Sequence, residues 1–311
     1  SYYAEIILNT SEPYVDEVAY TIACDRPSNL RMLADKDAGY LYQLNAESIY
    51  DMASKVPYAE ISEKEDYSTL KYKTESGWLE TPREVYYKYL VMFNRYIIAP
   101  WRWPDTYNGC FYRTFLPYDK TYNVSLFERV SNASTLYEAA YLVDYWLRAD
   151  IQSWWHPGPK PRGWYNIYFH LTDPNAGIWC GEFSIIYEVA ARAMLIPTIN
   201  VVDIAEDHQF NNFWYNDSWH HVDASSGSSG VNGTWVNYFD PPRGYHDSWF
   251  QGTYPMEWEE DGMYDVPWRS KVPYNPPDKL ANLHFHVTDL NGKPIDGARV
   301  EVWSHWAIES G

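Results

Sequence analysis

The feature that most constrains this fold is an apolar pattern of helical period that begins at Cys180 and stops at Pro197. Its apolar residues recur at helical spacing and share one face: Phe183, Ile186, Tyr187, Ala190 and Met194. Pro197 prevents the helix from continuing. The run T-I-N-V-V-D-I that starts at Thr198 is β-branched and apolar, as is typical of a strand. The sequence therefore predicts a helix with Cys180 at its N-terminus, followed by a sheet.

Two further strands are expected after this point, at residues 209–215 and 219–223. Between them stands Asn216-Asp217-Ser218, a sequence that favours a hairpin turn. We therefore expect a three-stranded antiparallel sheet that packs against the Cys180 helix, which is an α+β fold. In this arrangement His208 begins one strand, and Asp223 ends the partner strand roughly opposite to it.

The N-terminal region, residues 1–133, combines short helical patterns with polar, aromatic loops, and we expect a mainly helical extension there. Its clearest helix starts at Thr81-Pro-Arg-Glu-Val, because proline is favoured in the first turn of a helix. The apolar face of that helix is formed by Tyr86, Leu90 and Phe93.

Residues 134–280 are expected to form the core together with loops that wrap around it. Thr135 followed by Glu138 is the pattern of a capping box, and the apolar positions after it predict an amphipathic helix to about Ile151. The sequence W-W-H-P-G-P-K-P at 154–161 predicts a loop, since prolines lack the backbone donor that regular structure needs.

A separate module is expected at residues 281–311, where two strand-like segments flank Asn291-Gly292, a strong hairpin signal. The sequence L-H-F-H-V-T-D-L-N-G-K-P-I-D-G-A-R-V-E-V-W resembles the opening of an immunoglobulin-like or carboxypeptidase-regulatory-like β-sandwich. The resemblance implies a spacer or binding module that begins with a β-hairpin.

Charge and hydropathy exclude two classes of partner. The chain carries 24 Lys and Arg against 42 Asp and Glu, a formal net charge of −18, which repels phosphate backbones. No nucleic-acid partner is therefore expected. Apolar runs fall short of the roughly 20 residues that cross a bilayer, so membrane insertion is not expected either.

The three cysteines are Cys24, Cys110 and Cys180, and none belongs to a C-x-x-C motif. A zinc site built from thiolates is therefore disfavoured. In an oxidising compartment Cys24 and Cys110 would form a disulfide that leaves out Cys180; otherwise they are two buried thiols. The sequence leaves both possibilities open.

Cys180 is the candidate nucleophile of the chain. A helix N-terminus places partial positive charge and unbonded backbone N–H groups beside a thiol, and this favours the thiolate. The same N–H groups can form part of an oxyanion hole. His208, on a strand expected to pack against the helix, is the candidate base, and Asp223 is the candidate group that orients the imidazole.

Five motifs follow one another in residues 134–225: L-Y-E-A-A-Y-L-V-D-Y-W-L-R, G-I-W-C-G-E-F, R-A-M-L-I-P, D-H-Q-F-N-N-F-W and W-H-H-V-D-A-S. In order and spacing they resemble the core of the transglutaminase-like superfamily. The resemblance implies a papain-like core, in which the helix that bears the nucleophile packs on an antiparallel sheet, and a triad of Cys180, His208 and Asp223. Two positions depart from the family pattern, because Phe210 stands where Trp is common and Asn212 where Glu is common.

The resemblance also implies a reaction. The Cys180 thiolate attacks the amide carbonyl of a protein or peptide, His208 protonates the leaving amine, and water or a second amine resolves the thioester. Hydrolysis is favoured over crosslinking because no second-amine site is evident, and cell-wall peptide is one candidate substrate. No metal or organic cofactor is required. A second oxyanion donor is expected upstream of Cys180, and four side chains qualify by polarity: Trp164, Asn166, Asn175 and Trp179.

The principal alternative is a catalytically silent module that keeps the fold and binds peptide or glycan through aromatic loops. The side chains expected to do so are Trp154, Trp155 and Trp164.

Three features of the sequence predict an extracellular or cell-surface protein. They are the Asn-x-Ser/Thr triplets, the possible disulfide and the terminal hairpin.

A zinc hydrolase is a weaker alternative. It would use His220 and His221, or His284 and His286, although neither pair has an obvious third ligand. Glu182 is a further acid near the nucleophile, but a carboxylate in the first turn of a helix is already explained by the helix dipole.

Overall fold

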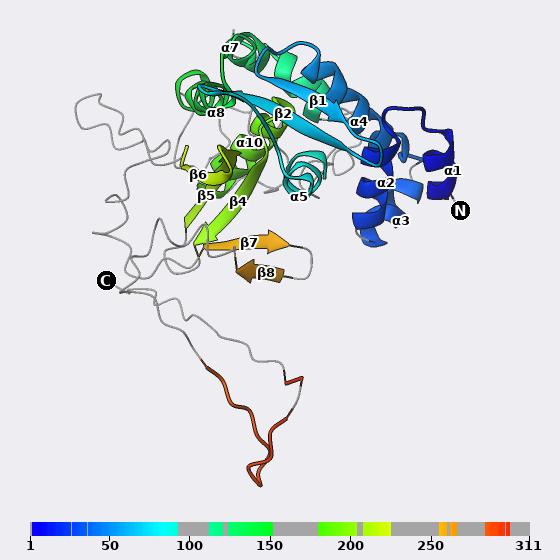
Figure 1. Cartoon of the computed structure of the whole chain (residues 1–311), viewed down its shortest axis with the longest axis vertical. Coiled ribbons are helices and arrows are strands. Elements are labelled where there is room, and N and C mark those ends of the chain that lie inside the picture. The colour runs from blue at the N-terminus through cyan, green and yellow to red at the C-terminus, as the bar shows by residue number, and fades with distance from the viewer. Residues whose placement is uncertain are drawn as a thin grey trace, which may run out of the picture. The chain divides into compact units, whose positions relative to one another are not determined.

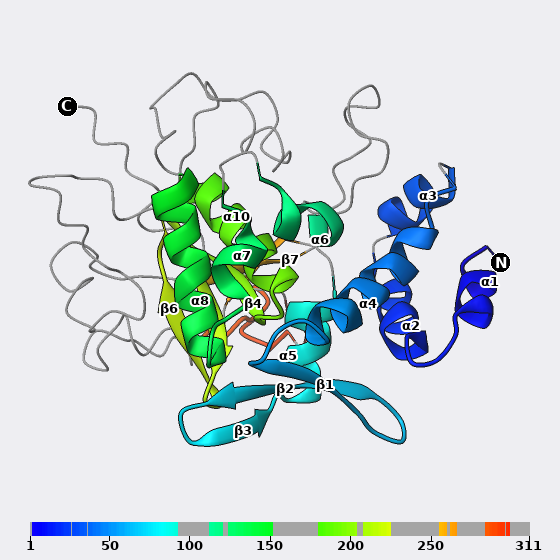
Figure 2. The same cartoon turned by 90° about the horizontal axis from the view of Figure 1, so that it is seen from above.

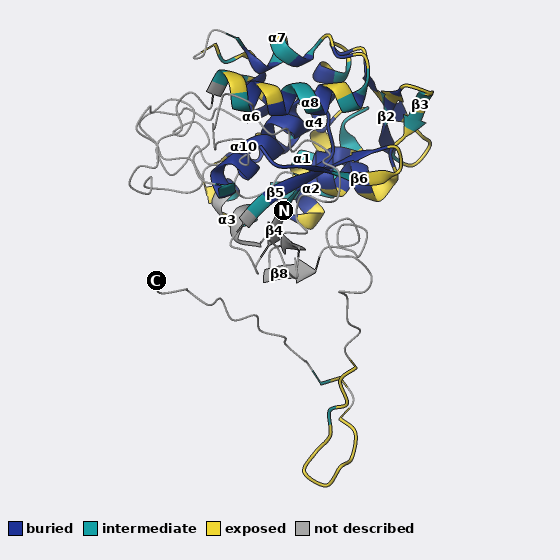
Figure 3. Cartoon of the chain, turned by 90° about the vertical axis from the view of Figure 1, so that its left-hand side faces the viewer, coloured by how far each residue is buried: buried dark blue, intermediate teal, exposed yellow. Residues whose placement is uncertain are grey.

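In the computed structural model, the Cys180 helix is present as predicted and forms α10 (Cys180–Ala193). Its residues from Gly181 to Ala193 are all buried, and a helix that is buried on every side belongs to a core. Figures 1 and 3 show α10 among other helices and strands that cover it. The structure describes residues 2–25, 27–35, 37–92, 112–120, 124–151, 180–203, 208–224, 255–259, 262–265, 284–295 and 297–298.

The chain divides into two units. Ser1–Val201 and Gln209–Pro241 make up the first unit, and Val202–His208 and Pro242–Gly311 make up the second. The boundary expected at residue 133 therefore falls inside the first unit. Helices and antiparallel sheets together give the α+β class that the sequence predicted.

Helices fill the N-terminal part of the first unit. They are α1 (Tyr2–Asn9), α2 (Val15–Cys24), α3 (Pro27–Asp35) and α4 (Tyr40–Ala53). Figure 2 shows α2 beside α4. Val18 of α2 and Leu41, Ala46 and Ile49 of α4 are fully buried, so the two helices contribute apolar faces to the core.

A three-stranded antiparallel sheet follows these helices, where the sequence pattern predicted only helices and loops. Its strands, in order across the sheet, are β1 (Ala59–Glu63), β2 (Ser68–Thr74) and β3 (Gly77–Glu80). The central strand buries Ser68, Thr69 and Thr74, and Thr69 Oγ1 donates a hydrogen bond of 2.6 Å to the Thr81 carbonyl oxygen. Polar residues at buried positions hide the alternation that normally identifies a strand.

The helix predicted from Thr81-Pro-Arg-Glu-Val is present. Pro82 is the N-cap of α5 (Arg83–Tyr86), which continues as a π-helical turn, η1 (Tyr87–Val91). Tyr86 and Leu90 are buried as expected, and Phe93 lies outside the described residues. Short helical segments follow: α6 (Tyr112–Phe115), η3 (Leu116–Tyr118) and α7 (Leu126–Val130).

The amphipathic helix predicted after Thr135 is α8 (Leu136–Tyr145), which continues as η4 (Trp146–Ile151). Thr135 Oγ1 accepts the Glu138 backbone N–H at 3.1 Å, as an N-cap should. The Glu138 carboxylate accepts the Ser134 backbone N–H at 2.7 Å. The return bond therefore reaches back one residue farther than in the predicted capping box.

The sheet predicted beside α10 is present as well. Its strands include β4 (Thr198–Asp203), β5 (His208–Tyr215) and β6 (Ser218–Val222), and β5 lies between β4 and β6. β5 and β6 are antiparallel, and Asn211 lies opposite Val222. Asn216 and Asp217 form their turn at φ of 49° and 57°, and two residues in this left-handed region match the twist of a tight hairpin.

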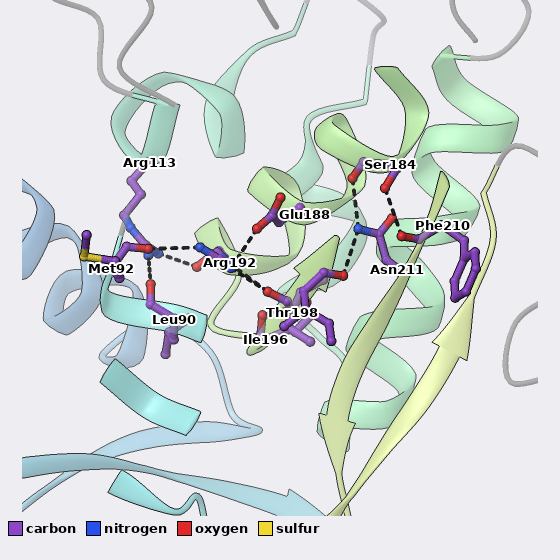
Figure 4. A network of polar contacts seen from close by, with 11 residues as sticks. Leu90, Met92, Arg113, Ser184, Glu188, Arg192, Ile196, Thr198, Phe210 and Asn211 are labelled. Atoms are coloured by element: carbon purple, nitrogen blue, oxygen red, sulfur yellow. Dashed lines mark hydrogen bonds and ion pairs between the residues drawn. The ribbon is translucent and has the colours of Figure 1, made fainter. Parts of the chain in front are cut away.

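Two buried arginines tie α10 to neighbouring elements (Figure 4). Arg192 forms an ion pair with Glu188 at 2.7 Å and donates to the Thr198 carbonyl oxygen at 2.7 and 3.0 Å. Arg113 donates to the carbonyl oxygens of Leu90 and Arg192. These two carbonyls lie in the last turns of η1 and α10, where helical N–H partners run out, so Arg113 caps both helices.

Described parts of the second unit include a hairpin and a turn. β7 (Pro255–Glu259) and β8 (Gly262–Asp265) are antiparallel. Around Asn291-Gly292 the predicted turn is present, with Gly292 at φ 81° and a bridge between Thr288 and Pro294. Among the residues described there, the two predicted strands are reduced to this bridged pair.

Candidate active site

Cys180 is the first residue of α10 and is half-buried. The next residue, Gly181, lies against Gln209 of β5: a Cβ added to Gly181 would stand 3.1 Å from Gln209 Oε1. Glycine at this position therefore lets the first turn of the helix approach the strand closely. Cys180 thus lies at the N-terminus of its helix, as its sequence pattern predicts, whereas no sequence signal pointed to Gln209 as the neighbour of Gly181.

Side-chain bonds hold α10 against β5 just beyond this turn (Figure 4). Ser184 Oγ donates to the Phe210 carbonyl oxygen at 3.0 Å. Asn211 Nδ2 donates to the Ser184 carbonyl oxygen at 3.0 Å and to the Ile199 carbonyl oxygen at 3.2 Å. Both side chains are buried, so these bonds are protected from water and fix the register of the helix against the strand.

The three predicted triad residues fall at the ends of these elements. His208 is the first residue of β5, and its side chain lies outside the described part of the structure. Asp223 directly follows β6, one residue after Val222, and only 3% of it is exposed. The oxyanion candidates Trp164, Asn166, Asn175 and Trp179 lie outside the described residues, as do Trp154 and Trp155.

A buried ion pair near Asp223 was not anticipated. Asp144 and Arg148 stand one turn apart on α8 and its extension, and Arg148 donates to the Asp144 carboxylate. Burial, and more weakly the negative charge of Asp223, raises the pKa of Asp144 to about 6, while Arg148 opposes this shift. The i, i+4 spacing of Asp and Arg within an apolar helix was the available signal.

The two positions that depart from the family pattern are both buried. Phe210 packs against the His221 ring, with centroids 4.8 Å apart. Asn212 lies opposite His221 across the β5–β6 ladder and is 1% exposed. These residues therefore belong to the packed interior of the sheet. Glu182, in the first turn of α10, is also buried, at 4% exposure.

The histidines considered for zinc have other surroundings. His220 Nε2 lies 3.0 Å from both Ser218 Oγ and the Tyr215 carbonyl oxygen, at the turn end of the hairpin. His284 and His286 are exposed. Within the described ranges, no group of three His, Cys, Asp or Glu side chains is arranged to hold a metal ion.

Cys24 is an exposed thiol at the end of α2 and is not part of a disulfide; Cys110 lies outside the described residues. Among the helices that the structure describes, none is both long and apolar enough to cross a membrane. No family model matches this chain, and no curated protein matches it significantly.

Proposed function

We propose that this protein is a thiol hydrolase or acyltransferase with a papain-like, transglutaminase-like core. In this proposal Cys180 is the nucleophile, His208 the base and Asp223 the group that orients the imidazole. The substrate is an amide of a protein or peptide, and a peptide of the cell wall is one candidate. An extracellular or cell-surface location belongs to the same proposal.

The observation that carries the proposal is the position of Cys180. The thiol stands in the first turn of a 14-residue helix, where backbone N–H groups have no helical partner. It is half-buried, whereas the rest of α10 is buried, so the thiol residue is the solvent-accessible residue of this helix. Gln209, the residue after His208, lies over Gly181, the residue after Cys180.

The reaction follows from these roles. The Cys180 Sγ bonds to the substrate carbonyl carbon, and the carbonyl π electrons move to the oxygen, which backbone N–H groups stabilise. Collapse of this intermediate breaks the C–N bond, and the imidazolium of His208 gives its proton to the leaving amine. Water, activated by the neutral imidazole, then attacks the thioester and releases the acid. An amine in place of water would give transfer.

Alkylation by iodoacetamide tests the proposal without a known substrate. Cys24 is an internal reference, because it is an exposed thiol in the same molecule. We expect Cys180 to react faster than Cys24 at neutral pH, although it is less exposed, as followed by intact mass and peptide mapping. His208→Ala should remove this advantage. His220→Ala is the matched control, since His220 bonds the turn of the β5–β6 hairpin, and it should preserve the advantage.

Two other results would redirect the proposal. A Cys180 that stays inert while Cys24 reacts would favour the silent binding module. Activity that is lost with EDTA and insensitive to alkylation would favour a zinc hydrolase.

A further inference from the structure

Glu17, in the first turn of α2, carries a carboxyl group that neighbouring elements enclose. The residue is fully buried, at 0% exposure. Tyr86 Oη of α5 donates to Glu17 Oε1 at 2.8 Å, and Tyr50 Oη of α4 lies 3.4 Å from the same oxygen. Figure 2 shows α2 beside α4. The carboxyl therefore joins α2 to elements that follow it in sequence by 33 and 69 residues.

The Tyr50 hydroxyl extends these contacts to β2. Tyr50 Oη lies 2.9 Å from Ser68 Oγ, and the Ser68 backbone N–H donates to Tyr87 Oη at 3.2 Å. Tyr50 Oη also lies 3.1 Å from the Pro13 carbonyl oxygen. A hydroxyl has one proton, so Tyr50 donates to Pro13 or to Glu17 but not to both at once.

The second carboxyl oxygen, Glu17 Oε2, is buried and has no hydrogen-bond partner within the described part of the chain. An ionised carboxylate spreads its charge over both oxygens and needs donors at each of them. A protonated carboxyl is neutral, and its burial costs far less free energy. The surroundings of Glu17 therefore fit the neutral acid better than the anion.

Cations are also kept away from this carboxyl. The sequences of α2 and α4 contain no lysine or arginine. On α5 and η1 the cations are Arg83 and Lys88, and both are exposed. On β2, Lys71 forms an ion pair with a glutamate of β1 at 3.5 Å, and Lys73 is exposed. Among the described residues, none forms an ion pair with Glu17.

The other titratable groups around Glu17 are tyrosines and acids. They are Tyr14 and Asp16 at the start of α2, Tyr50 on α4, Glu63 on β1, Tyr86 on α5 and Tyr87 on η1. Burial raises the pKa of Glu17 to about 7; the bond from Tyr86 opposes this shift, and the charge of Asp16 adds to it. Burial also raises the pKa values of Tyr50, Tyr86 and Tyr87, so these hydroxyls stay neutral while Glu17 titrates.

We propose that the Glu17 carboxyl is a pH switch for the docking of α2: when protonated it holds α2 against α4, α5 and β2, and when ionised it favours the separation of α2 from them. Such an opening is local. It requires a ten-residue helix to leave its neighbours while the rest of the unit stays folded. The switch does not depend on the proposed function.

Amide hydrogen exchange of the full chain, read by mass spectrometry on peptides of α2, tests the switch. The pKa of Glu17 is higher in the docked state, so its contribution to docking is present at low pH and is lost as pH rises through about 7. Corrected for intrinsic exchange rates, the α2 protection factor should fall roughly tenfold between pH 6 and pH 8. In Glu17→Gln the fall should be smaller by that factor.

Asp16→Asn is the matched control, because Asp16 is the preceding acid of the same helix and is exposed. It should keep most of the wild-type fall. Peptides of α10 are the internal reference. If α2 opens by itself, its protection factor should be lower than that of α10.

Tyr86→Phe provides a second test, which also serves if circular dichroism shows that Glu17→Gln does not fold. This variant removes a donor that favours the anion, so the pKa of Glu17 should rise further. The fall in α2 protection should then move to higher pH.

Four outcomes overturn the inference. They are a wild-type α2 protection factor that stays constant from pH 6 to pH 8, a fall in Glu17→Gln as large as in the wild type, a fall in Tyr86→Phe at unchanged pH, and equal protection factors in α2 and α10. Equal protection would mean that α2 opens only when the whole unit unfolds.

Discussion

Two regions of the first unit bury a carboxylate in different ways. In the N-terminal helices, Glu17 of α2 is fully buried and accepts a hydrogen bond of 2.8 Å from Tyr86 Oη. Burial raises its pKa to about 7, although the tyrosine bond opposes the shift. On α8, Asp144 is also buried but pairs with Arg148, and burial raises its pKa from 3.8 to about 6.

The two buried carboxylates differ in the group that contacts them, a tyrosine hydroxyl for Glu17 and a guanidinium for Asp144. A hydroxyl donor satisfies a protonated acid as well as an ionised one, so Glu17 can take up a proton at little cost. A guanidinium holds its partner ionised, so Asp144 remains an anion at neutral pH. At pH 7 Asp144, with a pKa of about 6, is therefore mostly ionised, whereas Glu17, with a pKa of about 7, is about half protonated.

The largest effect is expected where a buried cation is removed. Arg192→Met leaves Glu188, whose pKa burial already raises, without its ion pair inside α10. It also leaves the Thr198 carbonyl oxygen without two donors. We expect a loss of about 3–5 kcal/mol in the free energy of unfolding, measured with urea at pH 7.

Arg129→Met is the control for this variant, because the Arg129–Asp150 pair is partly exposed, at 28% and 15%. Its loss should be about 1 kcal/mol or less. If Arg192→Met and Arg129→Met lowered the free energy of unfolding equally, the buried ion pair would contribute no more than the partly exposed one, contrary to this prediction.

A smaller effect, with a defined pH dependence, is expected at Glu17. Its folded-state pKa of about 7 lies above the usual 4.5, so the native protein keeps a proton that the unfolded chain releases. Stability should therefore fall as pH rises from about 4.5 to about 7, by about 3 kcal/mol for this group. Glu17→Gln should lose about 3 kcal/mol less than the wild type over that range, as measured by urea unfolding at several pH values.

The control is Glu84→Gln, which changes an exposed glutamate of α5 in the same part of the unit. Its curve should follow that of the wild type. A Glu17→Gln curve that falls as much as the wild-type curve between pH 4.5 and 7 would mean that Glu17 is ionised in the folded protein.

The sequence was informative where local signals and packing agreed. Strong start and stop signals marked three elements. Thr135 marks the start of α8, Pro197 follows the end of α10, and Asn216-Asp217 forms the turn of the β5–β6 hairpin. The placement of Cys180 in the first turn of α10 followed from the same pattern. These elements are also those whose motifs carry the family resemblance.

Long-range contacts supplied what the sequence did not. Strand β2 was missed because Thr69 and other polar residues are buried there and satisfied by distant backbone groups. The approach of Asp144 to Asp223 depends on how α8 lies along β6, a packing relation between residues 79 positions apart. No local periodicity encodes that relation, whereas the i, i+4 spacing of Asp144 and Arg148 was visible.

The central claim, that Cys180 forms a thioester with an acyl group, is tested most directly by trapping that thioester. The protein is incubated at neutral pH with an activated ester, p-nitrophenyl acetate, quenched in acid and mapped by mass spectrometry. We predict an acetyl group on Cys180 in excess over Cys24, reversed by hydroxylamine, absent in Cys180→Ala and much reduced in His208→Ala. Acetylation of Cys180 no greater than that of the exposed Cys24, or unchanged by His208→Ala, would contradict the account.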